Sequence, residues 1–325
     1  MRICLIGHHD DHPDEGVRNI TLQLARELAK RHTVAKIDVN DVFGWLKVRA
    51  YRPDVMHFVL GPSSSLGFMV CKVYSLLYPS AGTVLSAVQP SFPPGMHWLM
   101  RLGPQIILAQ SLASQKIFTG AGYKSVLLPG GVDINRFHPV SAINKSELRK
   151  KFGISEKKLV ILHVGAINEG RNVSSLTALQ HEGTQVIVVG RPSEKPYRQT
   201  LQRLFRAGVQ VWTEYLPKIE EVYAIADCYV FPCTNMHSSV EIPLSVLEAM
   251  ACNLPVVTMR FGGLPDIFIE SGGFTFADDE VDMLRKVDGW RIQKPETTTR
   301  QQVERYSWAS TMTQIEAVYA QITRR

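Results

Sequence analysis

The stretch of sequence with the clearest chemical potential is EIPLSVLEAMA, which places two carboxylates, Glu241 and Glu248, seven positions apart. Pro243 suits the first position of a helix. From there, helical spacing puts four residues on one face, namely Leu244, Leu247, Glu248 and Ala251. A carboxylate on an apolar face is costly unless it is hydrogen-bonded, and two adjacent sugar hydroxyls can supply the donors. The competing interpretation leaves Glu248 in solvent and makes Glu241 a cap of the helix.

A second candidate is Arg171, in the stretch HVGAINEGRNVSSL. The pattern predicts a buried strand that ends at Val164 and a helix that begins near Asn172. A cation near a helix N-terminus is unfavourable by about 0.3–1 kcal/mol unless an anion binds there as well. A phosphate would accept hydrogen bonds from the guanidinium and from backbone N–H groups together. The alternative is a surface arginine paired with Glu169.

The third candidate is the opening loop GHHDDHPDEG, residues 7–16, with three histidines. Residues 12–15, HPDE, resemble the His-Pro-Asp-Asp motif of zinc-dependent sugar deacetylases, in which a His and an Asp bind zinc. Such enzymes need a further His-x-Asp-His motif, and no later histidine of the chain lies in that context. The stronger candidate is Gly16, because a glycine at a strand-to-helix turn lets the backbone approach a ligand closely.

The elements that position these residues alternate along the chain. An amphipathic helix is predicted at Gly16–Arg31, and polar residues 139–158 mark a domain boundary. Apolar strands that alternate with helices indicate parallel βαβ units, and 325 residues suit two such domains. The predicted strands are Ile3–Ile6, Thr33–Ile37, Val55–Leu60, Thr83–Val88, Ile106–Ala109, Ser125–Leu128, Leu159–Val164, Thr184–Val189, Val209–Trp212, Cys228–Phe231, Pro255–Thr258 and Gly273–Phe276.

Composition narrows the class of protein and its partners. No run of 18 apolar residues and no signal-peptide pattern occurs, and the five cysteines contain no Cys-x-x-Cys pair, so a cytoplasmic protein with reduced, buried thiols is expected. The net charge is +6, and residues 1–140 hold 14 basic and 9 acidic residues. This surplus favours an anionic partner such as a phospholipid surface, although a solvated basic face is the simpler explanation. It is too modest to predict nucleic-acid binding.

Several segments together resemble the retaining glycosyltransferase family 4, the glycosyl transferases group 1 with the GT-B fold. The resemblance covers nearly the whole chain, and the matching segments occur in the family's order. They are EGVRNITLQLARELAKRHTV, LLPGGVDINRFHP, HVGAINEGR, EVYAIADCYVFPC and SVLEAMACNLPVVTMRFGGLPDIF.

The resemblance implies an α/β architecture of two doubly wound, Rossmann-like domains that face each other across a cleft. Residues 1–140 and a C-terminal helix at 307–325 would form the acceptor side, and residues 155–306 would bind the donor. The implied activity moves a sugar from a UDP- or GDP-sugar to a glycan or lipid-linked glycan, as in polysaccharide biosynthesis, with retention and without a metal or other cofactor. A peripheral location at the inner membrane face would fit such an acceptor.

The resemblance also assigns roles to residues. Glu248 would hold the ribose hydroxyls and Glu241 the donor sugar, while Arg171 would bind the diphosphate and the backbone N–H of Gly16 the distal phosphate. Fixed positive groups of this kind stabilise a leaving diphosphate. Further donor-binding positions are Gly165, Gly190, Leu244, Ser245 and Val246, and the acceptor or sugar side would include Gln89 and His8.

Departures from the family pattern leave a second function open. The two glutamates of the family are eight positions apart, but position 240 is Val, so either Glu241 serves from a loop one residue shorter or the sugar contact is lost. Ala166 replaces the family's first phosphate-binding arginine, and Gln89 replaces its histidine. A GT-B protein that binds a nucleotide sugar without transferring it therefore remains an alternative. Three arginines could replace the missing cation: Arg18, Arg191 and Arg260.

Overall fold

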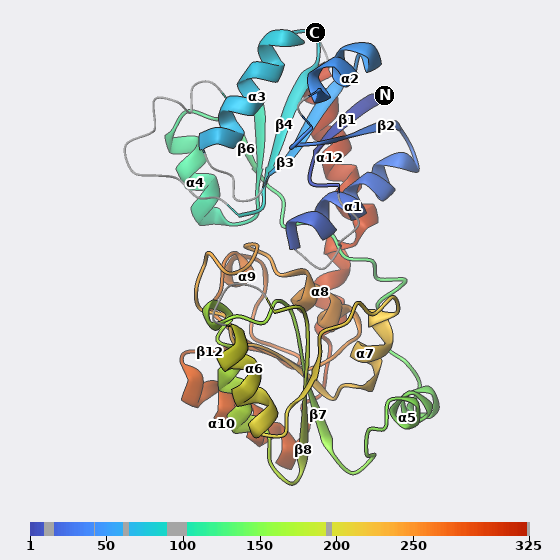
Figure 1. The fold of residues 1–325 in the computed structure, drawn as a ribbon, viewed down its shortest axis with the longest axis vertical. Coiled ribbons are helices and arrows are strands. Elements are labelled where there is room, and N and C mark those ends of the chain that lie inside the picture. The colour runs from blue at the N-terminus through green and yellow to red at the C-terminus, as the bar shows by residue number, and fades with distance from the viewer. Residues whose placement is uncertain (10–15, 42, 61–64, 90–102, 193–196, 324–325) are drawn as a thin grey trace. The chain divides into compact units, whose positions relative to one another are not determined.

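The computed structural model describes residues 1–9, 16–41, 43–60, 65–89, 103–192 and 197–323. Residue contacts divide the chain into two compact units, which are coloured along the chain in Figure 1. Unit 1 consists of Met1–Gly130, Val240–Ile242 and Trp308–Arg325. Unit 2 consists of Gly131–Ser239 and Pro243–Ser307. The short segment Val240–Ile242, which carries Glu241, thus belongs to unit 1 although the chain on both sides of it belongs to unit 2.

Unit 1 is built on a parallel six-stranded sheet in the order β2-β1-β3-β4-β5-β6. The chain turns to one side of β1 first and to the other side afterwards, which is the doubly wound pattern that leaves a crevice at the carboxyl ends of the central strands. The strands are β1 (Arg2–Gly7), β2 (Thr33–Asp38), β3 (Val55–Leu60), β4 (Gly82–Ala87), β5 (Ile106–Ala109) and β6 (Ser125–Leu127).

Helices cover both faces of this sheet. Helices α2 (Gly44–Tyr51), α3 (Ser65–Leu77) and α4 (Leu112–Gly120) share one hydrophobic cluster with the strands. Helices α1 (Gly16–Ala29) and α12 (Trp308–Thr323) contact each other and are drawn on the other side of the strands in Figure 1. The last helix is therefore part of unit 1, although it follows the whole of unit 2 in the sequence.

A buried histidine fastens α12 to the sheet of unit 1. His57 of β3 is completely buried, and its Nδ1 lies 2.6 Å from the hydroxyl of Tyr319 on α12. Its Nε2 lies 2.8 Å from the hydroxyl of Ser86 on β4. Burial lowers the pKa of His57 to about 3, so the ring is neutral at pH 7. A neutral ring offers one donor and one acceptor, which matches its two hydroxyl partners.

Unit 2 repeats the same architecture with a parallel sheet in the order β12-β11-β10-β7-β8-β9. Its strands are β7 (Leu159–Val164), β8 (Thr184–Val189), β9 (Gln210–Trp212), β10 (Cys228–Phe231), β11 (Val256–Met259) and β12 (Phe274–Ala277). Its helices are α5 (Ala142–Lys151), α6 (Tyr197–Arg206), α7 (Ile219–Ile225), α8 (Leu244–Ala251), α9 (Leu264–Ile267), α10 (Glu280–Ile292) and α11 (Thr299–Val303), with the 3-10 helices η2 (Glu169–Arg171), η3 (Val173–Leu179) and η4 (Glu304–Tyr306).

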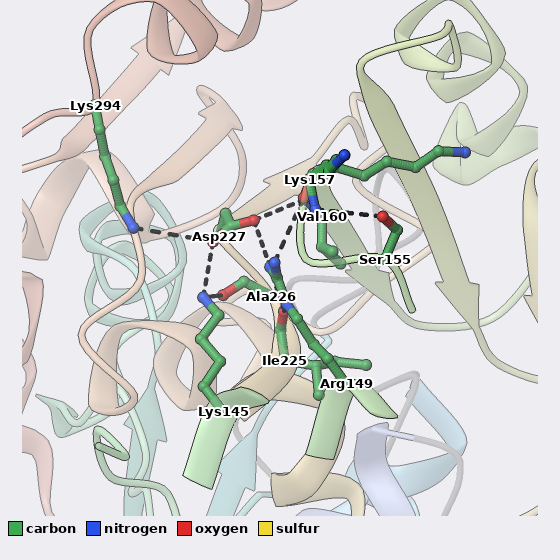
Figure 2. Close-up of polar contacts among 10 residues, drawn as sticks. Lys145, Arg149, Ser155, Lys157, Val160, Ile225, Ala226, Asp227 and Lys294 are labelled. Carbon is green, nitrogen blue, oxygen red and sulfur yellow. Dashed lines mark hydrogen bonds and ion pairs between the residues drawn. The ribbon is translucent and has the colours of Figure 1, made fainter. Parts of the chain in front are cut away.

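The polar segment predicted as a boundary contains helix α5, which is part of unit 2 (Figure 2). Its Lys145 and Arg149 each contact the Asp227 carboxylate, at 2.8 and 2.5 Å. The same two cations donate to the last carbonyls around the end of α7, at Ala226 and Ile225. The first segment of unit 1 ends at Gly130, before the predicted boundary at 139–158.

The predicted fold class is confirmed. All twelve predicted strands are present, and their ends agree within one residue. The helix predicted to begin near Asn172 is present, and it is the 3-10 helix η3, which begins at Val173. Val173, Leu176 and Leu179 repeat every three residues and are all completely buried, which is the spacing that a 3-10 helix places on one side. No helix among the residues described here has the length and apolar character needed to cross a membrane.

Candidate functional site

The candidate site of unit 2 lies where strands β7 and β8 end, because two glycines bring their following loops together. Gly165 follows β7 and Gly190 follows β8. A Cβ on Gly190 would overlap the carbonyl oxygen of Gly165. A Cβ on Gly165 would overlap Nη1 of Arg171. Neither position can hold a larger residue without moving its neighbour. Because Gly165 has no side chain, the guanidinium of Arg171 can lie directly over this pair of loops.

Arg171 is held at this place by a neighbouring loop of the same unit. It lies in η2, its backbone N–H donates to Oδ1 of Asn168 at 2.9 Å, and its Nε donates to the carbonyl of Ser238 at 2.8 Å. With Nε engaged, the outer nitrogens Nη1 and Nη2 of the guanidinium point elsewhere, and Nη1 lies over Gly165. A guanidinium fixed in this way presents its charge in one direction.

Three stacked rings lie beneath this loop and connect it to helix α8. His163 stacks on Tyr229 with ring centroids 6.2 Å apart, and Tyr229 stacks on Tyr223 with centroids 6.1 Å apart. The Tyr229 hydroxyl lies 3.2 Å from the carbonyl of Val164 and 2.7 Å from Oγ of Ser245. The start of α8 is thereby tied to the end of β7. The sequence reasoning missed these rings, although a histidine and a tyrosine in otherwise aliphatic strands were a usable signal.

His163 is neutral in this environment. Its Nδ1 lies 2.9 Å from the carbonyl of Val230, which can only accept, so Nδ1 carries the proton. Burial chiefly, and the nearby Arg171, lower its pKa to about 4, although the bond to Val230 acts in the opposite direction. Its Nε2 is therefore an acceptor, and it lies 3.3 Å from where a Cβ of Gly165 would be.

Glu248 lies on the inner face of α8, as its spacing predicts. The side chain is only 7% exposed, and its Oε2 accepts a 2.7 Å hydrogen bond from the hydroxyl of Tyr223. Burial raises the pKa of Glu248 to about 7, and the Tyr223 bond and the charge of Arg136 offset only part of this effect. The interpretation of Glu248 as a solvent-facing residue is therefore wrong. A carboxyl this deeply buried gains from a ligand that donates hydrogen bonds to it.

The start of α8 is open to an anion. The helix begins at Leu244, with Pro243 as its N-cap rather than its first residue, and the cap makes no side-chain hydrogen bond. The first backbone N–H groups of a helix have no partner inside the helix. Those of Leu244 and Ser245 stand at this end, whereas the N–H of Val246 donates to the carbonyl of Pro243 at 3.1 Å. The three predicted donor-binding positions and Glu248 belong to one short helix.

The three arginines considered as substitutes for a cation at position 166 have different surroundings. Arg191 directly follows Gly190, and its carbonyl accepts from the N–H of Ile167 at 2.8 Å, so it flanks the loop pair. Arg260 lies 3.7 Å from Glu270 and 3.6 Å from Asp278 and stacks on the ring of Phe276. Arg18 belongs to unit 1. Of these three arginines, Arg191 is thus the one that adjoins the site in unit 2.

In unit 1, the structure brings Gly16 and Glu241 into one neighbourhood. Gly16 begins α1, and a Cβ there would lie 3.2 Å from the side chain of Val240. The N–H of Glu241 donates to the carbonyl of Val88, the neighbour of Gln89, at 3.0 Å. Gly16 follows β1 and Gln89 follows β4 in the chain, and open α/β sheets bind ligands beyond the carboxyl ends of such strands.

The Glu241 carboxylate has partners that the sequence did not indicate. Its Oε1 accepts hydrogen bonds from the hydroxyls of Ser111 at 2.8 Å and Ser114 at 2.6 Å, and the side chain is only 6% exposed. Ser111 is the N-cap of α4, so the carboxylate lies at the positive end of that helix. Glu241 does not cap α8, the role that the competing interpretation gave it, because its bonds go to α4 instead.

The histidines of the opening loop separate into described and undescribed positions. His8 follows β1 and is partly exposed. His9 is fixed by two bonds: its N–H donates to Asp38 at 3.0 Å, and its ring Nε2 lies 3.0 Å from the carbonyl of Leu5. The HPDE motif at residues 12–15 lies outside the described residues.

Comparison with known proteins decides which family has these features. Residues 144–301, which include Gly165, Arg171 and Glu248, match the family Glycosyl transferases group 1. The resemblance seen in the sequence is therefore confirmed for most of unit 2.

Curated relatives of this chain are glycosyltransferases. The sulfoquinovosyl transferase SQD2 of Arabidopsis thaliana is 28% identical over 306 residues, which cover 83% of this chain and 57% of the relative. The GDP-mannose-dependent alpha-(1-6)-phosphatidylinositol monomannoside mannosyltransferase of Mycolicibacterium smegmatis is 27% identical over 56% of this chain and 50% of the relative. The chain thus spans about half the length of the curated relatives that it matches.

Solved structures show the same fold at low sequence identity. Alr3699/HepE of Anabaena, in complex with UDP, superposes with a TM-score of 0.77 at 18% identity and covers 99% of this chain and 100% of its own. The sucrose-phosphate synthase of Thermosynechococcus elongatus has a TM-score of 0.79 at 14% identity over 99% of this chain and 98% of its own. The chain therefore has the GT-B fold.

Proposed function

We propose that this chain is a retaining, metal-independent glycosyltransferase that moves a sugar from a UDP- or GDP-sugar to a glycan or lipid-linked acceptor. The observation that carries the proposal is the Glu248 carboxyl, buried on α8 in the same unit as Arg171 and the Gly165 loop. The family match supports transfer as the reaction. The names of the relatives support the nucleotide and lipid classes, since one depends on GDP-mannose and acts on a phosphatidylinositol mannoside, and a similar structure holds UDP.

In the proposed complex, unit 2 binds the nucleotide diphosphate. The Glu248 carboxylate accepts hydrogen bonds from the two ribose hydroxyls, while Tyr223 keeps its other oxygen occupied. The diphosphate lies against the guanidinium of Arg171 and the open N-terminus of α8, where backbone N–H groups and the helix dipole favour an anion. Arg191 supplies further positive charge beside the loop pair, in place of the arginine that Ala166 replaces.

Catalysis then rests on stabilising the diphosphate as it leaves. The bond between the anomeric carbon and the distal phosphate oxygen breaks, and the acceptor oxygen bonds to the anomeric carbon on the same face. The acceptor proton passes to the leaving phosphate, so the chain needs no separate base for this step. Arg171 and the N–H of Gly16 are the proposed donors to the developing negative charge. Gln89 and His8 are proposed to contact the acceptor or the transferred sugar.

Glu241 is proposed to act by position. Its Oε1 already binds Ser111 and Ser114, so we assign it the anchoring of Val240–Ile242 on unit 1 rather than a bond to the donor sugar. This assignment also favours a second candidate function, a nucleotide-sugar-binding protein without transferase activity. Formation of free nucleotide diphosphate together with a glycosylated acceptor would exclude that candidate.

The test is a thermal-unfolding screen of UDP-, GDP- and ADP-sugars in the presence of a chelator. One nucleotide series should raise the unfolding temperature of the wild-type chain, and Glu248→Gln and Arg171→Ala should lose that response while remaining folded. Arg260→Ala is the matched control, because it removes an exposed arginine of the same unit that pairs with Glu270 and Asp278. An unchanged response in both site variants would contradict the assignment, and a response that requires metal would contradict the metal-independent mechanism.

A further inference from the structure

Helices α2, α3 and α4 form one layer on one face of the unit 1 sheet. Phe68 of α3 packs on Phe118 of α4 with ring centroids 6.2 Å apart. Tyr78, just after α3, donates its hydroxyl to the carbonyl of Trp45 on α2. Val48, Phe68 and Phe118 all belong to the same buried cluster. The three helices therefore belong to one layer, and we call the outer side of this layer the α2–α4 face.

Helix α3 is apolar on both of its sides. Its inner side chains, Phe68 and Cys71, are completely or almost completely buried against the sheet. Its outer side carries a second apolar stripe at helical spacing, Met69, Val73, Leu76 and Leu77, all of which are exposed. A surface helix normally turns charged or polar residues outward, so the outer stripe of α3 is not explained by folding of unit 1 alone.

The neighbouring helices extend this apolar surface. The exposed large hydrophobic side chains of the described residues number seventeen, and nine of them lie on or directly before these three helices. The others are spread over the rest of the chain. Besides the α3 stripe, the nine are Phe43, Trp45, Leu46, Leu112 and Ile117. An apolar patch of this extent, set apart from the scattered hydrophobic residues elsewhere, marks an interaction surface.

The charge of the same helices has one sign. Residues 44–51, 65–77 and 112–120 contain four cations and no aspartate or glutamate. The cations are Lys47, Arg49, Lys72 and Lys116. Lys47 pairs with Asp41, which precedes α2, so three positive charges stand beyond that pair. Cations beside exposed apolar side chains are complementary to a surface of anionic headgroups over acyl chains.

We infer that the α2–α4 face is a membrane-binding surface that inserts Leu76, Leu77 and their apolar neighbours between anionic phospholipids. A second copy of the chain fits this face less well, because a twofold interface would place the cations of one copy against those of the other. The inference goes beyond the proposed transferase activity and does not depend on it. It would place unit 1 at the surface where a lipid-linked acceptor resides.

Vesicle flotation tests the inference directly. The wild-type chain should float with vesicles of phosphatidylcholine and phosphatidylglycerol, and should not float with phosphatidylcholine alone or in high salt. Leu76→Glu/Leu77→Glu should reduce binding to the anionic vesicles by at least about tenfold. Lys72→Ala and Lys116→Ala should each reduce it by about fivefold.

Ile143→Glu/Ile292→Glu is the matched control for the double variant. It makes the same change in charge at exposed residues of unit 2, where Ile143 is 72% and Ile292 is 85% exposed, compared with 68% for Leu76. This control should float like the wild type. Equal flotation of Leu76→Glu/Leu77→Glu and the wild type, or no flotation of the wild type, would overturn the inference. So would a wild-type dimer that the same double substitution converts to a monomer.

Thermal stabilisation by nucleotide diphosphate, measured on the same variants, separates this inference from the proposed function. The nucleotide site is assigned to unit 2, so Leu76→Glu/Leu77→Glu should keep its nucleotide response. Loss of flotation with the response retained supports the membrane surface. A wild type that floats but shows no nucleotide response would contradict only the proposed function.

Discussion

The hydroxyl of Tyr223 donates a 2.7 Å hydrogen bond to Oε2 of Glu248, and both side chains are buried in unit 2. This bond favours the ionised form of the carboxyl, against burial, which favours the neutral form. The pKa of about 7 that results means that small changes around Glu248 alter its charge at physiological pH.

Tyr223→Phe is therefore expected to weaken nucleotide binding at pH 7. A hydrogen bond to a charged group contributes about 1.5–3 kcal/mol, so loss of the hydroxyl should raise the Glu248 pKa and weaken binding by about tenfold or more. Titration calorimetry across pH 6 to 9 should show the binding curve shifted to higher pH. Tyr306→Phe, which removes a hydroxyl 3.5 Å from the carbonyl of Ile267, is the control. Equal affinity in both variants would contradict the role of Tyr223.

Glu248→Gln should change how stability depends on pH. The folded chain holds the Glu248 proton up to about pH 7, whereas the unfolded chain releases it near pH 4.5. The folded state thus binds more protons between these values, and the unfolding free energy falls as pH rises through this window by up to about 3 kcal/mol. Urea titrations at a series of pH values give the unfolding free energy of each protein. Between pH 4.5 and 7 this free energy should fall more steeply with pH in the wild type than in Glu248→Gln. Parallel profiles would show that the pKa is not raised.

Alanine at the two site glycines should separate binding from folding. Gly165→Ala would push the guanidinium of Arg171 aside and abolish nucleotide stabilisation, with a smaller effect on folding because a side chain can move. Gly190→Ala would meet the backbone oxygen of Gly165, so a loss of about 1–3 kcal/mol of stability is expected. In Gly289→Ala the new Cβ meets nothing within 4 Å, and alanine inside α10 should stabilise the chain by about 0.5–1 kcal/mol. Calorimetric unfolding with and without UDP or GDP measures all three.

Glu241→Ala should destabilise unit 1 without removing the nucleotide response. The substitution deletes the acceptor of the Ser111 and Ser114 hydroxyls, and leaving buried donors without it costs about 1–3 kcal/mol. Ser114→Ala should lose less, because Ser111 still binds the carboxylate. If Glu241→Ala instead keeps full stability and loses transfer, the carboxylate contacts the donor sugar and the anchoring role is wrong.

Asp227→Ala should be the most destabilising of these substitutions. It leaves the buried Arg149 without its carboxylate, and breaking a buried ion pair from one side costs about 3–5 kcal/mol. Burial by itself would raise the pKa of Asp227, but Lys145, Val160 and Arg149 outweigh it and the pKa is lowered. The stabilisation is therefore complete above pH 3.8 and is lost as the pH falls through the lower pKa of the folded chain. Acid titration should show this loss in the wild type but not in Asp227→Ala.

Residues that are near one another in the sequence are enough to specify the strands of both sheets and the local order of the unit 2 site. Short apolar runs bounded by polar or glycine residues are typical of strands, and all twelve strands were predicted from them within a residue. The burial of Glu248 was also predictable, because helical spacing with Leu244 and Leu247 fixes its face. Each of these features depends on residues that are separated in the sequence by fewer positions than one helix contains.

Contacts between residues that are far apart in the sequence became visible in the folded chain alone. Glu241 and Ser114 are 127 positions apart, and Lys145 and Asp227 are 82, and no local spacing encodes such pairs. The same holds for η3 and for α5. Whether a three-residue apolar repeat forms a 3-10 helix, and where a highly charged helix lies, depends on the surface against which each one packs. Burial removes water from these polar groups, so each needs a partner that the fold, and not the neighbouring sequence, supplies.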